Sequence, residues 1–173
     1  VLKQNGSINE SLIVSQKSVQ LEPQDAEAHN NLGVTLQELG RLDGAKKSYR
    51  KAITLKPNYV EAHSNLGNTL KEQDRLDEAE ISYRKAITLK PNYVEAHNNL
   101  GVTLKDLGRL DKAETSYRQA ITLKPNYVEA HNNLGVTLHE LGRLDEAETS
   151  YRKAITLKPD YAEAHNNLGI TLQ

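Results

Sequence analysis

The sequence repeats itself every 34 residues, and this period restricts its fold more strongly than any other feature. Residues 94–127 and 128–161 differ at only five positions. Periods of this length are typical of proteins in which each repeat is a small supersecondary unit that packs against its neighbours. We therefore expect an array of stacked units rather than a globule built around one core.

The period divides the chain into complete and partial repeats. We expect a single array in which residues 1–25 are a partial repeat and residues 162–173 are the first helix of a truncated repeat. In the partial repeat Gly6 aligns with Gly108, so its helix should begin near residue 7. The complete repeats are 26–59, 60–93, 94–127 and 128–161.

Each repeat has the apolar pattern of two helices. In the repeat at 60–93, Ala62 and Leu66 belong to one stripe with helical spacing, and Ala79 and Tyr83 belong to a second. Between the stripes lies a position at which a left-handed backbone would end the first helix. It is filled by Gly40, Asp74, Gly108 and Gly142. A proline closes each second helix, at Pro23, Pro57, Pro91, Pro125 and Pro159.

Pairs of polar residues spaced as in capping boxes predict where the helices begin. Second helices should be capped by an aspartate with a glutamate three residues later, as in Asp77 with Glu80. First helices should be capped in the same way, as in Asn58 with Glu61. The equivalent glutamates are Glu27, Glu95, Glu129 and Glu163, and we interpret their recurrence as structural.

Composition excludes several classes of function. The 22 Lys and Arg residues nearly balance the 23 Asp and Glu residues, so no strong positive field favours nucleic acid. The absence of cysteine excludes disulfides and thiolate metal sites. No apolar run approaches the roughly 20 residues that span a bilayer. We therefore expect no nucleic-acid partner, no membrane insertion and no cofactor. The sequence does not fix a location, and the cytoplasm is our expectation.

The repeated columns resemble those of tetratricopeptide repeats. The family pattern of large, small and aromatic residues is matched by His97, Leu100, Gly101, Leu104, Ala113, Tyr117, Ala120 and Pro125. The resemblance covers the whole chain, although His97 stands where the family often has tryptophan. It implies an all-α fold, an α-solenoid of antiparallel helical hairpins that forms a right-handed superhelix. It also implies a concave face that is lined by the first helices and holds extended peptides or helices.

An asparagine occupies one column in every repeat of the chain. Its members are Asn31, Asn65, Asn99, Asn133 and Asn167. A side-chain amide both donates and accepts hydrogen bonds, so this asparagine ladder could pair with the backbone of an extended peptide. It resembles the asparagine ladder in the repeat superhelix of O-linked N-acetylglucosamine transferase. Alternatively, each amide bonds to the backbone of a neighbouring repeat and fixes the stacking.

Further polar residues are expected on the same face. The candidate peptide-binding residues beside the ladder are Asn30, Asn98, Asn132, Asn68, Lys71 and Lys105. The family's clamp for C-terminal carboxylates needs Lys or Arg where this chain has glutamates, so we expect no such clamp. A histidine column, which includes His97 and His131, is interpreted as packing, because members 34 residues apart are too far separated to share one metal ion.

The leading functional hypothesis is a protein–protein interaction scaffold that binds an extended peptide or a partner helix. We expect no enzymatic activity, because no nucleophile with an adjacent base and no phosphate loop is present. The alternative is a substrate-recruiting arm of a larger enzyme, for example a glycosyltransferase. RNA recognition is disfavoured by the near-neutral charge. The partial repeats at the two ends also predict head-to-tail self-association, because their unpaired helices expose complementary faces.

Overall fold

The computed structural model describes the backbone of residues 2–173 and the side chains of residues 8–173. Within this range the chain forms ten α-helices and no strand. They are α1 (Leu2–Leu21), α2 (Ala26–Glu38), α3 (Leu42–Leu55), α4 (Val60–Glu72), α5 (Leu76–Leu89), α6 (Val94–Asp106), α7 (Leu110–Leu123), α8 (Val128–Glu140), α9 (Leu144–Leu157) and α10 (Ala162–Thr171). The all-α fold expected from the sequence is confirmed.

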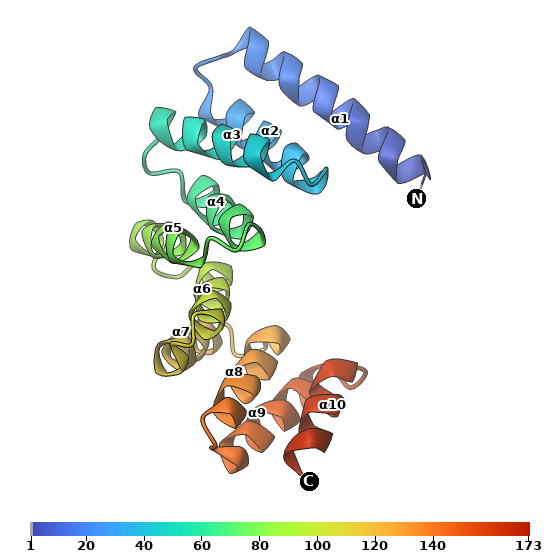
Figure 1. Cartoon of the computed structure of the whole chain (residues 1–173), viewed down its shortest axis with the longest axis vertical. Helices are drawn as coiled ribbons and strands as arrows, with labels where there is room; N and C mark the ends of the chain where they lie inside the picture. The colour runs from blue at the N-terminus through green and yellow to red at the C-terminus, as the bar shows by residue number, and fades with distance from the viewer. Residues whose placement is uncertain (1) are drawn as a thin grey trace. The chain divides into compact units, whose positions relative to one another are not determined.

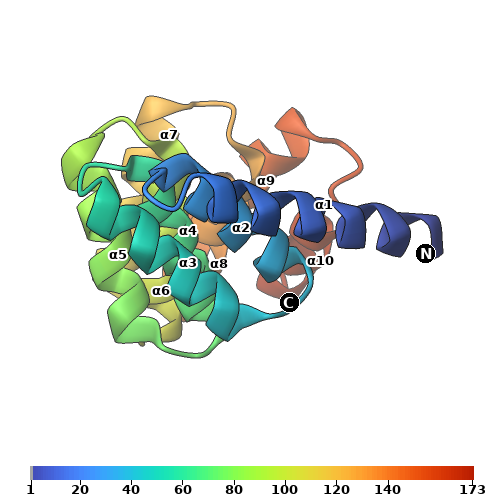
Figure 2. The same ribbon diagram turned by 90° about the horizontal axis from the view of Figure 1, so that it is seen from above.

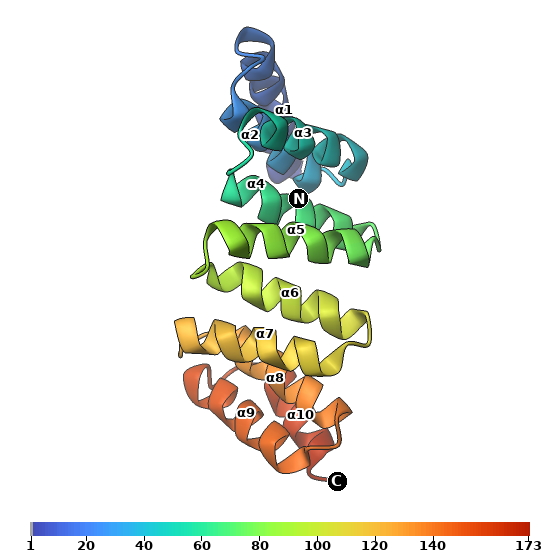
Figure 3. The same ribbon diagram turned by 90° about the vertical axis from the view of Figure 1, so that its left-hand side faces the viewer.

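The helices group into two compact units, one ending at Pro91 and the other beginning at Asn92. In the first unit, α2 pairs with α3 and α4 pairs with α5 as hairpins, and α1 packs against α2 (Figures 1 and 2). In the second unit, α6 pairs with α7 and α8 with α9, and α10 packs against α8 and α9 (Figure 3). Each complete repeat is thus one hairpin of antiparallel helices, as the two apolar stripes predict.

A tyrosine and a glycine bring the two helices of each hairpin together. In the hairpin of α8 and α9, Tyr151 of the second helix lies directly against Gly135 of the first. The tyrosines at this position are almost fully buried, and alanines fill the rest of the interface with no exposed surface. The same contact joins Tyr49 to Gly33, Tyr83 to Gly67 and Tyr117 to Gly101. Because glycine has no side chain, the ring can lie flat against the first helix.

The first helices end as the sequence predicts. Gly40, Gly108 and Gly142 have φ values of 69°, 71° and 74°, and Asp74 in the same column has φ 57°. This left-handed residue lets the next amide reach back to the helix, for example from Arg75 N to Leu70 O at 2.9 Å. The chain then passes immediately into the second helix.

The predicted capping boxes are wrong. The second helices have arginine rather than aspartate at the N-cap, and Asp77 lies inside the first turn of α5. Arg75, whose amide bonds back to α4, is itself the N-cap of α5, and Leu76 is already helical. No extended residue therefore remains at which an aspartate could cap α5. First helices begin after a tyrosine such as Tyr59, which makes no side-chain cap hydrogen bond. Asp25 does cap α2, since its carboxylate accepts from Glu27 N and Ala28 N.

The expected start of the first partial repeat also differs from the structure. We expected a turn at Gly6, but α1 begins at Leu2 and continues without interruption to Leu21. In the complete repeats the turn residue joins two helices that pack against each other, whereas the residues on both sides of Gly6 belong to α1 itself. A helix without that constraint can pass through a glycine at a cost of about 1 kcal/mol.

Candidate functional site

The first helices of neighbouring repeats form a shared face within each unit. Helices α2 and α4 approach each other, as do α6 and α8, and α8 and α10. The corresponding second helices, α3 with α5 and α7 with α9, have no Cα atoms within 8 Å of each other among the described residues, and long side chains span the gap between them. Each unit therefore bends toward its first helices. In each unit we call the side formed by its first helices the first-helix face; these helices are α2 and α4 in the first unit and α6, α8 and α10 in the second.

The asparagine ladder lies on this face and links consecutive first helices. The side-chain amide of Asn65 donates to the Asn30 Oδ1 atom at 3.2 Å, and Asn133 donates to Asn98 Oδ1 at the same distance. Asn167 donates to Asn132 Oδ1 at 3.1 Å. The partner is a side chain, and not the backbone considered above as the structural alternative. Each of these bonds uses one of the two amide hydrogens of the ladder residue.

The other predicted binding residues occupy different depths. Asn30, Asn98 and Asn132 are buried beneath the ladder, and Asn132 has no exposed surface. Its amide nitrogen donates to Glu163 Oε1 at 2.9 Å. These three asparagines position the ladder from below. Asn31 is exposed at the beginning of the face. Asn99 is half-buried on α6.

The remaining predicted residues lie near the ends of the first helices. Asn68 accepts a hydrogen bond of 2.7 Å from the hydroxyl of Tyr83. Lys71 is half-buried in the last turn of α4. Lys105 lies 3.6 Å from the carboxylate of Asp106 and 3.9 Å from that of Glu140. These residues therefore place polar groups and both positive and negative charges in the C-terminal halves of the first helices.

Two equivalent hollows open on the first-helix face, one in each unit. Between α2 and α4 a hollow of about 290 Å³ is lined by Val34, Gln37, Glu38, Tyr49, Asn65 and Glu72. Between α8 and α10 a hollow of about 180 Å³ is lined by Val136, His139, Glu140, Tyr151, Asn167 and Ile170. Both combine a ladder asparagine, a valine, the tyrosine of the preceding hairpin and a carboxylate. The repeat therefore generates the same kind of pocket twice.

The tyrosines beneath the face experience a negative local field. Burial raises the pKa of Tyr49, and the carboxylates of Glu72 and Glu38 raise it further. Burial also raises the pKa of Tyr117, with added contributions from Asp106 and Glu140. The Tyr117 hydroxyl is buried and has no hydrogen-bond partner among the described residues.

Sequence reasoning missed the carboxylates that produce this field. Every first helix of the four complete repeats ends on an acidic residue, and all four are exposed. They are Glu38, Glu72, Asp106 and Glu140. We call them the acidic row. The acidic column itself was visible in the sequence. Its place in the last helical turn could have drawn attention to it, because the C-terminal end of a helix favours cations over anions.

The histidine column has a local structural role. The Nε2 atom of His63 lies 3.0 Å from the carbonyl oxygen of Pro57, and His131 makes the same contact with Pro125 at 2.9 Å. Each histidine thereby fastens its helix to the preceding loop. Among residues 8–173, no group of three His, Asp or Glu side chains is arranged to hold a metal ion.

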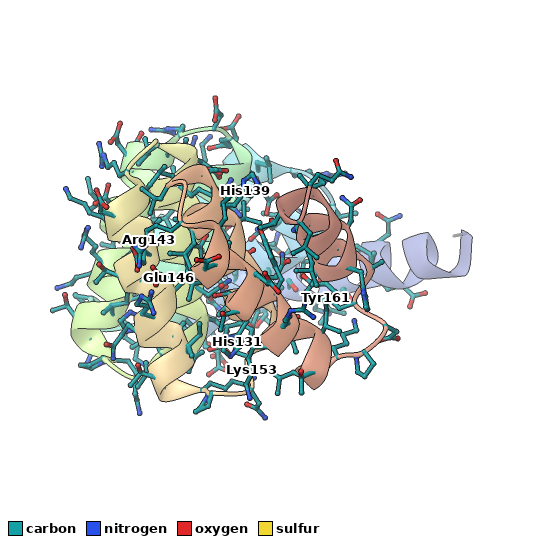
Figure 4. The ribbon with its side chains drawn as sticks, turned by 90° about the horizontal axis from the view of Figure 1, so that it is seen from below. His131, His139, Arg143, Glu146, Lys153 and Tyr161 are labelled. Carbon is teal, nitrogen blue, oxygen red and sulfur yellow. The ribbon has the colours of Figure 1, made fainter. Side chains whose placement is uncertain are left out.

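The second helices carry a separate network of ion pairs. Arg143 donates to Glu114 Oε2 at 2.6 Å and to Glu146 Oε2 at 2.7 Å, which joins the start of α9 to α7. Figure 4 shows Arg143 beside Glu146, while His139 lies apart from this pair. Burial raises the pKa of Glu114, but hydrogen bonds from Arg118 and Arg143 outweigh it and leave the pKa below its usual value. This network stabilises stacking on the side away from the ladder.

Comparisons with known proteins agree with this architecture. The profile described as TPR repeat matches residues 36–74, 67–108, 103–142 and 137–173. A second profile, described as tetratricopeptide repeat, matches residues 15–47. No curated protein matches the chain. No helix within residues 2–173 has the length and apolar character that crossing a membrane requires.

Several solved structures are similar over most of the chain. The crystal structure of MamA has 26% identity and a TM-score of 0.84, with 93% of this chain and 94% of that chain covered. TTC0263, a thermophilic TPR protein of Thermus thermophilus, has 25% identity and a TM-score of 0.75, with 99% and 93% covered. YrrB, described as a TPR protein with an unusual peptide-binding site, has 24% identity and a TM-score of 0.79, with 95% and 85% covered. The likeness to YrrB concerns the fold alone.

Proposed function

We propose, from the premise that this chain belongs to the tetratricopeptide-repeat family, that its first-helix face binds an extended peptide or a helix of a partner protein. The fold is that of an interaction scaffold, and its relatives are typically scaffolds rather than enzymes. The observation that carries the proposal is the asparagine ladder, which recurs beside a hollow of similar lining in each unit.

The chemistry of the ladder favours an extended peptide over a helix. The backbone groups of a helix are already paired with one another, whereas an extended segment presents N–H and C=O groups along its length. Asn65 and Asn133 each commit one amide hydrogen to the preceding helix. That bond fixes the orientation of the amide before a peptide arrives, which reduces the entropy lost on binding.

Replacing the ladder should weaken peptide binding without unfolding the chain. Short fluorescein-labelled peptides would be selected on the wild-type chain by phage display and measured by fluorescence anisotropy. We expect the combined Asn65→Ala and Asn133→Ala variant to bind them about fivefold to tenfold more weakly, since one lost hydrogen bond is worth about 1 kcal/mol. Unchanged affinity would assign the ladder to stacking alone.

A matched control separates binding from a general effect of truncation. Thr88 and Thr122 are exposed on the second helices, where each hydroxyl bonds only to the backbone four residues earlier. The combined Thr88→Ala and Thr122→Ala variant should keep wild-type affinity. Circular dichroism of both variants would establish that the helices remain formed.

We further propose that copies of the chain associate head to tail. Leu172, the C-cap of α10, is 58% exposed, whereas Leu138 at the same position of α8 is 1% exposed because α9 covers it. In α1, Val14 is 67% exposed, whereas Ser116 at the same position of α7 is 8% exposed beside α6. The α10 helix of one copy and the α1 helix of another could therefore cover each other.

Light scattering at increasing protein concentration tests this association. We expect the average mass to rise with concentration, because a head-to-tail contact leaves a free end on every assembly. The combined Val14→Asp and Leu172→Asp variant should remain monomeric, since it places charges on both apolar faces. A wild-type chain that stays monomeric at high concentration would overturn the proposal.

A cytoplasmic location remains a prediction.

A further inference from the structure

We infer that the peptide held on the first-helix face carries lysine or arginine side chains, and that the acidic row recognises them. The inference rests on the proposed function and narrows its ligand class. The row consists of the last residues of four first helices, Glu38, Glu72, Asp106 and Glu140. Three features support it: the position of these residues, the local balance of charge and the shape of the hollows beside them.

Helix stability does not account for the acidic row. The unpaired carbonyl groups at a helix C-terminus carry a partial negative charge, so a carboxylate there is unfavourable by a few tenths of a kcal/mol to about 1 kcal/mol. The acidic residues at the beginning of the first helices, such as Glu61 and Glu129, suit the helix dipole and need no ligand. The acidic row opposes the dipole in all four complete repeats. It therefore creates a site where a cation is favoured twice, by the carboxylates and by the helix ends.

The internal partners of the row leave negative charge in excess. In the first unit, Glu72 accepts a hydrogen bond from the uncharged Gln37. Lys71 is the basic residue in the last turn of α4. The last residues of α2 and α4 are thus two exposed carboxylates, Glu38 and Glu72, while the nearby ammonium group of Lys46 is paired with Asp43.

The second unit has the same balance with a different partner. Asp106 and Glu140 share the ammonium group of Lys105, at distances of 3.6 and 3.9 Å. Both distances exceed those of a well-formed charge-assisted hydrogen bond, which is about 2.7–2.9 Å. In the free chain the ammonium group of Lys105 therefore interacts weakly with the two carboxylates that would bind an ammonium group of the peptide.

The hollows have the shape and chemistry that a basic side chain requires. In the hollow between α2 and α4, Val34 offers apolar contact above the buried ring of Tyr49, while Glu38 and Glu72 lie on the same lining. A lysine or arginine side chain buries its aliphatic stem on apolar surface and keeps its charge near polar groups. Asn65 in the same hollow is positioned to hold the peptide backbone.

A fourth observation, independent of these three features, points to a ligand between α6 and α8. The Tyr117 hydroxyl has no hydrogen-bond partner among the described residues, although the side chain has no exposed surface. Burial raises the pKa of Tyr117, and the carboxylates of Asp106 and Glu140 raise it further, so the acidic row of this unit acts on this hydroxyl. An O–H group left without an acceptor costs about 1–3 kcal/mol, so this hydroxyl favours a local rearrangement on peptide binding that brings it an acceptor.

Three labelled peptides of equal length test the inference directly. They would share an alternating valine–threonine scaffold and carry lysine, glutamine or glutamate at the same positions. We expect the lysine peptide to bind most tightly in fluorescence anisotropy and the glutamate peptide most weakly. The advantage of the lysine peptide over the glutamine peptide should shrink as salt is added, because charge pairs at a surface are screened within about 10 Å at 0.1 M ionic strength.

Variants of the acidic row give the second arm of the test. The combined Glu72→Gln and Glu140→Gln variant should bind the lysine peptide about twofold to tenfold more weakly and the glutamine peptide unchanged. The Lys105→Gln variant, which copies Gln37 of the first complete repeat, should bind the lysine peptide more tightly. The combined Asp111→Asn and Asp145→Asn variant changes the net charge of the chain equally on exposed second-helix positions, and it should behave as wild type.

The possible results distinguish this inference from the proposed function. Equal binding of the lysine and glutamine peptides, with no effect of the Glu72 and Glu140 substitutions, would overturn the role of the acidic row and leave peptide binding by the ladder intact. Equal weakening by the Asp111 and Asp145 substitutions would also overturn it, because net charge alone would then explain the preference. Failure of all three peptides and of a phage-displayed library would overturn both proposals.

Discussion

Replacing Gly135 with alanine is expected to destabilise the second unit by about 1–3 kcal/mol. A Cβ atom at this position would lie 2.6 Å from Cε1 of Tyr151, well inside van der Waals contact. The tyrosine ring cannot move away freely, because it is 2% exposed and fixed between the two helices of the hairpin. The loss should appear as a lower midpoint in urea unfolding followed by circular dichroism.

Gly169 provides a matched control in the same column of the repeat. It lies in α10, where a Cβ atom would meet nothing within 4 Å. The Gly169→Ala variant should therefore gain about 0.5–1 kcal/mol from the higher helix propensity of alanine. Opposite shifts of the two variants would attribute the effect to the tyrosine contact. Similar shifts of both variants would show that the hairpins are not held together at this position.

The hydroxyl groups of Tyr117 and Tyr83 should respond in opposite ways to removal. Tyr117→Phe removes a buried hydroxyl without a partner, and we expect a gain in stability of up to about 1–3 kcal/mol. Tyr83→Phe removes the hydrogen bond of 2.7 Å to Asn68, and we expect a loss of about 0.5–1.5 kcal/mol. Both tyrosines have no exposed surface, so the two substitutions remove the same group from equally buried rings.

Urea unfolding of the two variants beside wild type measures this difference. The midpoint should rise for Tyr117→Phe and fall for Tyr83→Phe. If both midpoints fell by the same amount, the Tyr117 hydroxyl would have a hydrogen-bond partner in solution. The argument that this hydroxyl lacks an acceptor between α6 and α8 would then fail. The comparison is internally controlled, because both residues occupy the same column of neighbouring hairpins.

The helical hairpins could be predicted from the sequence because the repeats confirm one another. A single glycine such as Gly108 is weak evidence for the end of a helix. The same column contains Gly40, Gly142 and Asp74, and all four have the left-handed backbone that the column predicts. The column also identifies Asp74 as the residue that replaces glycine, which composition alone would not show.

The starts of the helices were predicted less well, for a physical reason. An aspartate and a glutamate three residues apart satisfy the spacing of a capping box, but the box also needs an extended residue before the helix. The closure of α4 by Arg75 leaves no such residue before Asp77. That closure depends on how two helices meet, and the spacing of polar residues does not report it.

The column of the asparagine ladder could be read from the sequence, but the hydrogen bonds of its members could not. A fixed column identifies Asn65 and Asn133 as equivalent, and helical periodicity places them next to the core. Their acceptors, Asn30 and Asn98, are 35 residues earlier in the chain and become neighbours only when the repeats stack. The charge of the acidic row was equally visible, but its meaning depends on Glu72 being the last residue of its helix.

The most direct test of the account follows the side-chain amide signals of the ladder by nuclear magnetic resonance during titration with the lysine peptide. The account predicts that the signals of Asn65 and Asn133 shift progressively with peptide, while the backbone signals of Thr88 and Thr122 on the second helices stay in place. Shifts confined to the second helices, with the ladder amides unmoved at saturation, would contradict the claim that the first-helix face binds the peptide.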